Sequence, residues 1–597
     1  MKSGMKGEKS RTRRRYAVTV PAALGVVLVL VVVLGACARI PTSGPVQYES
    51  MGTSEPGQTS LPVLVAGPEP GDSAQQVVSG FLNSMASYQT GQPVAREYLA
   101  PAVSERWQPE GVLVYDSAAV PISGAARGKV VIDVPKLAEV SANGAWTQAR
   151  PGEKIELDLK MTKVGGEWRI SQPPDSFVMS IFNFEREYQR YNLFFFDPDF
   201  EILVPDPVYV PMRGHLETLL VNALLGGPSP WLRPAVRSAL PDDTRLAAPA
   251  VTVDDGVATV DLDRKVLELY DPQRRFLLAQ LSWTLGQVSG VRQVRVTVDH
   301  VPLGTEDAGS RGDPTGWSAY DPSVAGSARG AYALADDRVV MLGPDRLTPV
   351  AGSLGKKPVR ARSIAVGIFG ERSAGQPLDP EESGGSDWLA TVSTDGRSAS
   401  VHGSTTGTRT VLRGNDIAEP SWDRTGLLWL VDRRDDRSRV VVVDDQDDVT
   451  TVVAPGLTGR TVRALKVSRE GARVAALVEE DGVTRLLMGR IERGDTIAIR
   501  GLRELPVTMT SMTDVAWSDF DQVAVTGADE ESPPRPALVS VDGSEVVELT
   551  SGPNSRTLAA AHDQPLLLGG EDGHLHLEDK NYLWTDQGAA TSPAYPG

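Results

Sequence analysis

The sequence predicts a multidomain protein in which an α+β N-terminal domain and a second α+β domain precede an all-β propeller of five or six blades. The 597 residues exceed what one hydrophobic core usually supports. Helical and strand periodicities alternate up to residue 304, and beyond it short apolar strands are separated by Asp, Gly and Ser turns. The predicted divisions are a signal peptide (1–36), a flexible tether (37–72), an N-terminal domain (73–184), a second domain (190–304), a linker (305–328) and a propeller (329–590).

The N-terminal segment carries a basic head and an unbroken apolar run that ends at Cys37, the only cysteine of the chain. Leu34, Gly35 and Ala36 precede this cysteine and supply the small residues that a signal peptidase recognises. We expect cleavage before Cys37, transfer of a diacylglyceryl group to its thiol and addition of palmitate to the same residue, so that the thiol serves attachment and not catalysis. The alternative is an uncleaved transmembrane helix, because the run approaches the ~20 residues that a span needs.

The chain is acidic, with a formal net charge of −17 at pH 7, and the predicted cleavage removes mostly basic residues. Such a protein is not expected to bind nucleic acid or an anionic lipid surface, so the membrane must be held through acyl chains. A single cysteine excludes an intrachain disulfide and a cysteine-based zinc site. We therefore predict a lipid-anchored protein on the extracytoplasmic face of the cell membrane.

The N-terminal domain is predicted to begin with a helix and to continue as a curved antiparallel sheet. Apolar residues recur at helical spacing over 77–85, and strand alternation follows over 155–161. A Gly165-Gly166 turn then leads to a return strand with Trp168 and Ile170. Helices before such a sheet are reminiscent of the cone-shaped nuclear-transport-factor-like fold.

The second domain has a more regular order of elements. Strands at 193–196 and 208–210 precede a helix over 216–224, which Gly226-Gly227-Pro228 ends. A hairpin around Asp254-Asp255-Gly256, a helix over 272–288 and a strand over 293–298 follow. The stretches LVNALLGGPSP and VATVDLD resemble the GerMN domain, and that resemblance implies a binding or scaffolding module without a catalytic set.

A weak repeat predicts the propeller. EPSWDRTGLLWLV at 419–431 recurs loosely at 464–478, 514–526 and 558–570. If Trp422, Val467, Trp517 and Ala561 are equivalent, the intervals are 45, 50 and 44 residues, as expected for one four-stranded blade per repeat. Earlier copies at 328–342 and 361–367 bring the number of blades to five or six. We expect Trp422, Trp517 and Ala561 to belong to the blade core and not to contact a ligand.

No nucleophile elbow, phosphate loop, zincin helix or EF-hand loop with acceptable spacing occurs in the sequence. We therefore predict that the protein is not an enzyme, with no catalytic residues, no cofactor and no metal. One alternative is a metal site formed by His574 and His576, which share a strand face, with His562 as third ligand.

Together with GGEWRISQPPDSF at the end of the first domain, this domain order resembles the actinobacterial LpqB lipoprotein family. The resemblance implies an accessory of the MtrA–MtrB two-component system that contacts the extracytoplasmic domain of the sensor kinase MtrB and influences cell-envelope homeostasis and division. The alternative is a wall-associated enzyme or glycan-binding protein that uses the propeller channel. That alternative predicts acids or histidines converging at the channel mouth.

Overall fold

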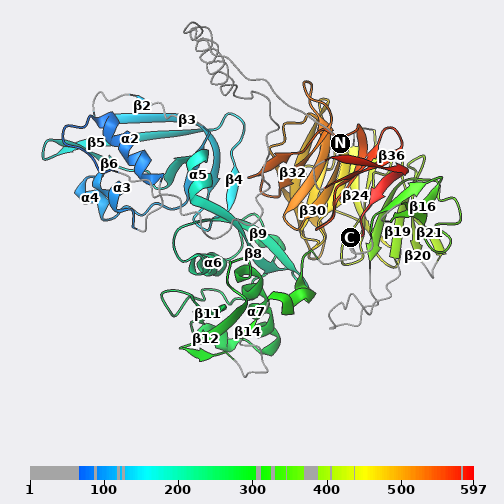
Figure 1. The fold of residues 1–597 in the computed structure, drawn as a ribbon, viewed down its shortest axis with the longest axis horizontal. Helices are drawn as coiled ribbons and strands as arrows, with labels where there is room; N and C mark the ends of the chain where they lie inside the picture. Colours follow the sequence, from blue (N-terminus) through cyan, green and yellow to red (C-terminus); the bar gives the residue numbers. More distant parts are fainter. Residues whose placement is uncertain are drawn as a thin grey trace, which may run out of the picture. The chain divides into compact units, whose positions relative to one another are not determined.

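The structure is a computed structural model that describes residues 66–86, 91–116, 122–123, 128–303, 311–312, 314–323, 330–343, 346–368, 387–403, 407–435, 437–579 and 583–597. These residues form two α+β modules and one all-β module, which confirms the predicted fold class (Figure 1). Within these ranges, no helix is both long enough and apolar enough to span a membrane.

In the first module, helices pack on a curved sheet. The helices are α2 (Ala74–Met85), α3 (Pro93–Glu97) and α4 (Pro101–Ser104), and the sheet runs β6 (Glu167–Gln172), β5 (Lys154–Val164), β3 (Lys129–Val140), β1 (Val112–Tyr115) and β7 (Phe177–Ser180), with β2 (Ile122–Ser123) and β4 (Trp146–Gln148) also on β3. Ser73 caps α2 in a capping box with Gln76. The apolar face of α2 is buried in one core with Ile132 and Ile170 of the sheet. The helix and the β5–β6 hairpin lie where the sequence predicts them.

The second module also follows the predicted order. It comprises α5 (Ile181–Glu187), β8 (Tyr188–Phe196), β9 (Leu203–Pro211), α6 (Leu216–Leu225), η2 (Arg233–Ala235), β10 (Thr252–Asp254), β11 (Val257–Leu262), η3 (Arg264–Glu268), α7 (Asp271–Leu285), β12 (Gln293–Val298) and β13 (Val301–Pro302). β11 pairs in parallel with β12, and α7 provides the crossover between them. Asp255 and Gly256 both have positive φ in the β10–β11 turn, which is the conformation that a two-residue hairpin loop requires.

Part of the predicted linker at 305–328 is folded, so this prediction needs correction. β14 (Arg311–Gly312) pairs with β12, and η5 (Pro314–Tyr320) follows it. Tyr320 lies 5.4 Å from Phe196 between ring centroids, and the backbone oxygen of Trp317 accepts a hydrogen bond from the Trp283 indole at 3.2 Å. Trp317 and Tyr320 stand among polar residues in the sequence, and for this reason the segment was predicted to be a linker. Their packing holds the segment on the second module.

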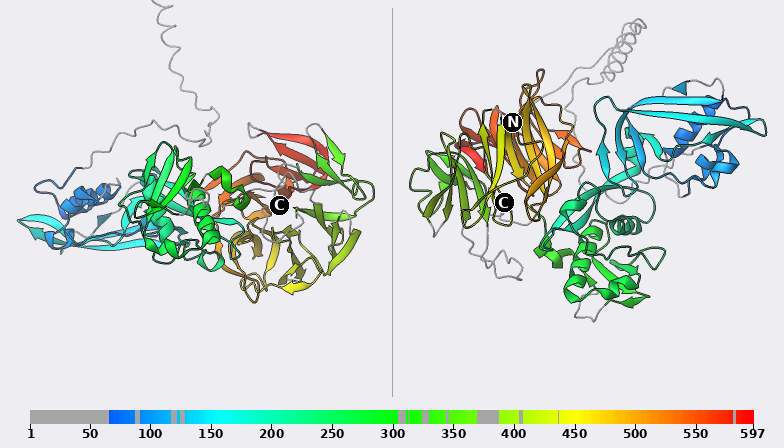
Figure 2. Two further views of the ribbon diagram at one scale, coloured as in Figure 1. Left: turned by 90° about the horizontal axis from the view of Figure 1, so that it is seen from below. Right: turned by 180° about the vertical axis from the view of Figure 1, so that it is seen from behind.

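The all-β module consists of six four-stranded antiparallel sheets within the described residues (Figure 2). Three of them are β17 (Leu347–Pro349), β16 (Arg338–Leu342), β15 (Tyr332–Ala335) and β38 (Thr591–Ala594); β18 (Ala361–Ile368), β19 (Asp387–Ser393), β20 (Ser398–Gly403) and β21 (Gly407–Arg413); and β22 (Ser421–Trp422), β23 (Leu428–Arg434), β24 (Arg437–Val443) and β25 (Val449–Thr451). The others are β26 (Thr461–Val467), β27 (Arg473–Glu480), β28 (Val483–Glu492) and β29 (Ala498–Glu504); β30 (Ser511–Asp519), β31 (Gln522–Ala528), β32 (Arg535–Ser540) and β33 (Val546–Glu548); and β34 (Ser555–Ala559), β35 (Leu567–Gly570), β36 (His574–Glu578) and β37 (Trp584–Ala589).

One strand from each sheet lines the propeller axis. β18 contacts β22, and the contacts continue through β26, β30, β34 and β38 back to β18. We call these six the ring strands. Because β38 pairs with β15, from the start of the module, the last strand of the chain closes the ring. The propeller therefore extends past the predicted boundary at residue 590.

A buried carboxylate organises the blade that contains β22. Asp423 accepts hydrogen bonds from the indole of Trp429 at 2.9 Å and from Arg493 at 2.7 Å, and its side chain is 0% exposed. Replacing Asp423 with Ala leaves the indole and the guanidinium without this acceptor. We expect Asp423→Ala to lower the free energy of unfolding by about 3–5 kcal/mol, measured by urea denaturation.

Asp444 provides the matched control, because it accepts backbone hydrogen bonds in an exposed turn. Asp444→Ala is expected to change the free energy of unfolding by less than about 1 kcal/mol. Equal losses in the two variants would contradict the organising role of Asp423.

Candidate functional site

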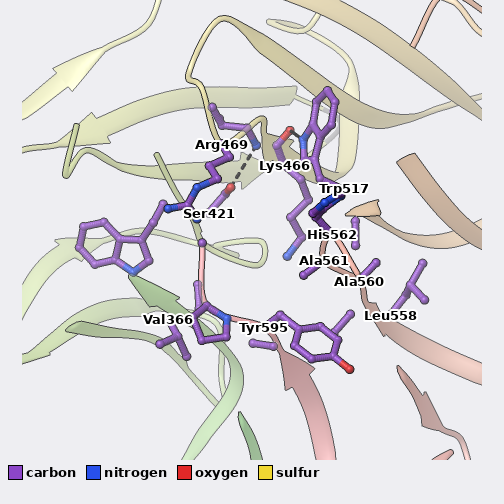
Figure 3. A pocket seen from close by; sticks show the side chains of 18 of the residues that line it. Val366, Ser421, Lys466, Arg469, Trp517, Leu558, Ala560, Ala561, His562 and Tyr595 are labelled. Carbon is purple, nitrogen blue, oxygen red and sulfur yellow. Dashed lines mark hydrogen bonds between the residues drawn. The ribbon is translucent and has the colours of Figure 1, made fainter. Parts of the chain in front are cut away.

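The ring strands enclose a cavity of about 130 Å³ on the propeller axis, which we call the axial cavity. Every ring strand contributes to its wall, with Val366 from β18, Trp422 from β22, Val467 from β26, Trp517 from β30, Leu558 from β34 and Ala594 from β38. Figure 3 shows Arg469, Lys466 and Trp517 on one side of the cavity and Val366 and Tyr595 on the other. The candidate functional site is therefore formed by all six blades.

The residues that align in the sequence repeat lie on this wall. Trp422, Val467, Trp517 and Ala561 all line the axial cavity. Trp422 also packs in a blade core, as predicted, whereas Trp517 is only partly buried and donates its indole N–H to the Lys466 carbonyl at 3.1 Å. The core placement is confirmed for Trp422, and the structure adds that the repeat position lies on the wall of the axial cavity.

A second space of about 170 Å³ is lined by Glu419, Asp514 and Arg463 among others, and Glu419 forms a partly exposed ion pair with Lys466 of the axial cavity. Lys466 Nζ lies 2.9 Å from Glu419 Oε2. Burial alone lowers the pKa of Lys466, but the Glu419 and Asp514 carboxylates outweigh it and raise that pKa. Burial, reinforced by Glu419, raises the pKa of Asp514. The positive charge of Lys466 is thus balanced by Glu419, a residue that lines the second space.

The acids of the axial cavity also have partners. Glu470 Oε1 lies 2.7 Å from Arg473 Nε, and both side chains are 1% exposed. Asp519 Oδ1 lies 2.8 Å from His562 Nδ1 and accepts the Phe520 amide at 2.6 Å. Burial raises the pKa of Asp519, and His562 opposes this shift.

Arg469 differs from these groups, because its Nε is buried without a hydrogen-bond partner. Sequence reasoning missed Arg469, Lys466 and Asp519. A usable signal exists, since the residue two positions after each of the four aligned repeat residues is charged, namely Arg424, Arg469, Asp519 and Asp563.

The remaining predicted sites are the lipidation site and the histidine metal site. Leu34, Gly35, Ala36 and Cys37 lie outside the described residues. His574 and His576 lie on β36, but His574 Nδ1 approaches Asp586 at 2.9 Å and His576 Nε2 approaches Asp572 at 3.0 Å, whereas His562 lines the axial cavity. Across the described ranges, no three His, Cys, Asp or Glu residues are grouped as metal ligands.

Three family models match the chain. They are described as "Lipoprotein LpqB, N-terminal domain" at residues 67–185, "Sporulation and spore germination" at 192–304 and "Lipoprotein LpqB beta-propeller domain" at 337–596. The chain is 32% identical to Lipoprotein LpqB of Thermobifida fusca over 95% of this chain and 97% of that protein. It is 28% identical to Lipoprotein LpqB of Mycobacterium tuberculosis over 87% and 88%.

Solved structures resemble parts of the chain. TolB from Acinetobacter baumannii is 11% identical, with a TM-score of 0.23, over 56% of this chain and 87% of that chain. The first GerMN domain of the sporulation protein GerM from Bacillus subtilis is 23% identical, with a TM-score of 0.16, over 19% and 86%.

Proposed function

Because the chain belongs to the LpqB lipoprotein family, we propose that it is a lipid-anchored extracytoplasmic protein that regulates a sensor histidine kinase of the MtrB type. The observation that carries this proposal is the relationship to Lipoprotein LpqB across 95% of the chain. The family resemblance implies the MtrA–MtrB two-component system as the pathway, with cell-envelope homeostasis and division as the processes affected.

Membrane attachment in this proposal occurs through Cys37. Two acyl signals hold a protein stably on a membrane, whereas one chain does so only marginally. Residues 41–72 have the Pro-, Gly- and Ser-rich composition of a linker. A flexible linker confines the folded modules near a membrane partner at an effective concentration of about the millimolar range. Regulation of the kinase therefore needs only a weak interface.

The proposed role is binding and not catalysis. The GerMN module and the propeller supply two separate folded surfaces, and the Glu470, Asp519 and Lys466 charges on the propeller axis are already paired. A general acid or base instead needs a proton-transfer position open to substrate. These features support an accessory protein that acts through contact with the extracytoplasmic domain of the kinase.

The test is calorimetric titration of residues 38–597 into the purified kinase extracytoplasmic domain. We expect saturable binding with a Kd of about 1–100 μM, and no binding to the corresponding domain of an unrelated sensor kinase. In cells, removal of the protein is expected to change phosphorylation of the response regulator.

The proposal would be contradicted if the titration gave no heat of binding at high micromolar concentration and phosphorylation of the response regulator were unchanged. If the same preparation then released sugars from purified cell wall, the second candidate would stand, a wall-associated enzyme or glycan-binding protein that uses the propeller channel. The observation that favours this candidate is the presence of Glu470, Asp519 and His562 around the axial cavity.

A further inference from the structure

The Arg469 guanidinium lines the axial cavity and makes no ion pair with a carboxylate among the described residues. Its Nε is buried and unpartnered, and no ion pair to Arg469 is found within the described ranges. The nearest acid in sequence, Glu470, is committed to Arg473 at 2.7 Å. The main chain of Gly597 lies close to the Arg469 side chain. A Cβ atom at position 597 would be 2.8 Å from a terminal nitrogen of the guanidinium. The Arg469 guanidinium therefore lies on the cavity wall without a carboxylate at ion-pair distance, and Asp321 and Glu470 attract it only from farther away.

A charge in this position is costly to the folded protein. Burial lowers the pKa of Arg469 to about 10, and Arg424 lowers it further, while Asp321 and Glu470 oppose the shift. At neutral pH the group is still protonated. Because burial of an unpaired charge is unfavourable, an anion that enters the cavity would recover interaction energy that the protein itself does not supply.

The rest of the cavity sets the size and polarity of such an anion. Its walls include the Trp517 indole and the apolar side chains of Val366 and Leu558 (Figure 3). The Trp422 indole also lines the cavity. A volume of about 130 Å³ corresponds to roughly four water molecules at ~30 Å³ each. An apolar pocket with one oriented charged group is typical of a site for a small organic ligand.

Charge balance decides between a carboxylate and a phosphate. The remaining cation on the wall, Lys466, is paired with Glu419 at 2.9 Å, and His562 is engaged with Asp519 at 2.8 Å. Among the described residues of the wall, Arg469 is thus the cation that no carboxylate contacts, and its single positive charge matches one negative charge. A dianionic phosphate would bring a second negative charge near Asp519 and Glu470 without a cation to meet it.

We propose that the axial cavity binds a small organic carboxylate, which pairs with the Arg469 guanidinium and places its apolar part against Trp422 and Trp517. The planar fork of the guanidinium suits a carboxylate bidentately. Both a free short-chain acid and the C-terminus of a peptide present this group. The proposal goes beyond regulation of a kinase and does not depend on it.

The experiment titrates residues 38–597 with sodium propionate, N-acetylalanine and inorganic phosphate at constant ionic strength, and follows tryptophan fluorescence and Tm. Because two indoles line the cavity, we expect a saturable fluorescence change with propionate at about 1–10 mM. N-acetylalanine, which mimics a peptide terminus, binds comparably if peptides are the source and at least about tenfold more weakly if free acids are.

Arg469→Met and Arg469→Lys are the test variants, and Arg556→Met is the control, because Arg556 lies on β34 with a side chain that is 75% exposed. We expect Arg469→Met to weaken propionate binding at least about tenfold, with Arg469→Lys between Met and wild type and the control unchanged. Without ligand, the Tm of Arg469→Met should equal or exceed that of the wild type, because a partly buried charge without an ion pair is removed.

Three results would overturn the proposal. The first is propionate binding that is absent in the wild type or equal in Arg469→Met. The second is tighter binding of phosphate than of propionate. The third is a Tm of Arg469→Met lowered by more than about 5 °C, because this would make Arg469 a structural residue.

Discussion

Truncation of the chain after Ala590 is expected to open the propeller ring and to lower the Tm of the propeller transition by about 10 °C or more. β38, which the truncation removes, pairs with β15 and contacts β18 and β34. The lost segment also includes Ser592, whose hydroxyl donates to the Arg362 carbonyl at 2.6 Å, and Tyr595, whose hydroxyl donates to the Pro565 carbonyl at 2.9 Å. The unpaired edge of β15 would then be exposed to solvent and to aggregation.

Differential scanning calorimetry of the purified chain measures this effect. A peptide of residues 591–597 should restore the Tm saturably when added to the truncated protein, because an extended peptide can add a strand to an open sheet edge. A peptide of scrambled sequence should not restore it. An unchanged Tm after truncation would show that the ring does not depend on β38.

The elements that the sequence predicted most accurately depend on local signals. The β5–β6 and β10–β11 hairpins were predicted from Gly165-Gly166 and Asp255-Gly256, and these residues do adopt positive φ in the turns. The helix over Ala74–Met85 was predicted from apolar periodicity. In each case the residues that determine the structure are neighbours in sequence, so a short window contains the information.

The elements that the sequence did not reveal depend on distant partners. β38 is a short strand that contains Pro593, and its pairing partner Tyr332 lies at the other end of the propeller segment. Trp317 and Tyr320 sit among Gly, Ser and Asp residues, and only their packing against the second module shows that the segment is folded. No pattern within a short window of the sequence predicts these contacts.

The candidate site also combines features that local sequence signals predict with features that depend on distant partners. The repeat placed Trp422, Val467, Trp517 and Ala561 in equivalent positions, and all four line the axial cavity. Periodicity alone did not show that this position faces the axis, because both faces of a propeller strand can be apolar. The unpaired state of Arg469 was also not predictable, since it depends on which carboxylates the other blades have already engaged.

Cys37→Ala is expected to abolish lipid attachment. If Cys37 is the acylated residue, cells fed labelled palmitate should incorporate label into the wild-type chain and not into the variant. The variant should also keep residues 1–36, because the small residues before Cys37 then no longer lead to an acylated cysteine. Intact mass of the purified proteins measures both changes, and Ser43→Ala in the adjacent segment is the matched control, expected to match the wild type.

Membrane fractionation alone would not separate the two explanations of the apolar run, because an uncleaved run can itself hold a protein at the membrane. Palmitate label and mass do separate them. An uncleaved transmembrane helix predicts the same mass apart from the substituted side chain, and no label, in wild type and Cys37→Ala alike. The acidic body offers no second attachment, since the whole chain has a net charge of −17 even with the basic residues of the N-terminal segment included, and negative charge is repelled by anionic lipids. If the wild type starts at Cys37 with its acyl groups, those groups therefore supply the whole attraction of the ectodomain to the bilayer.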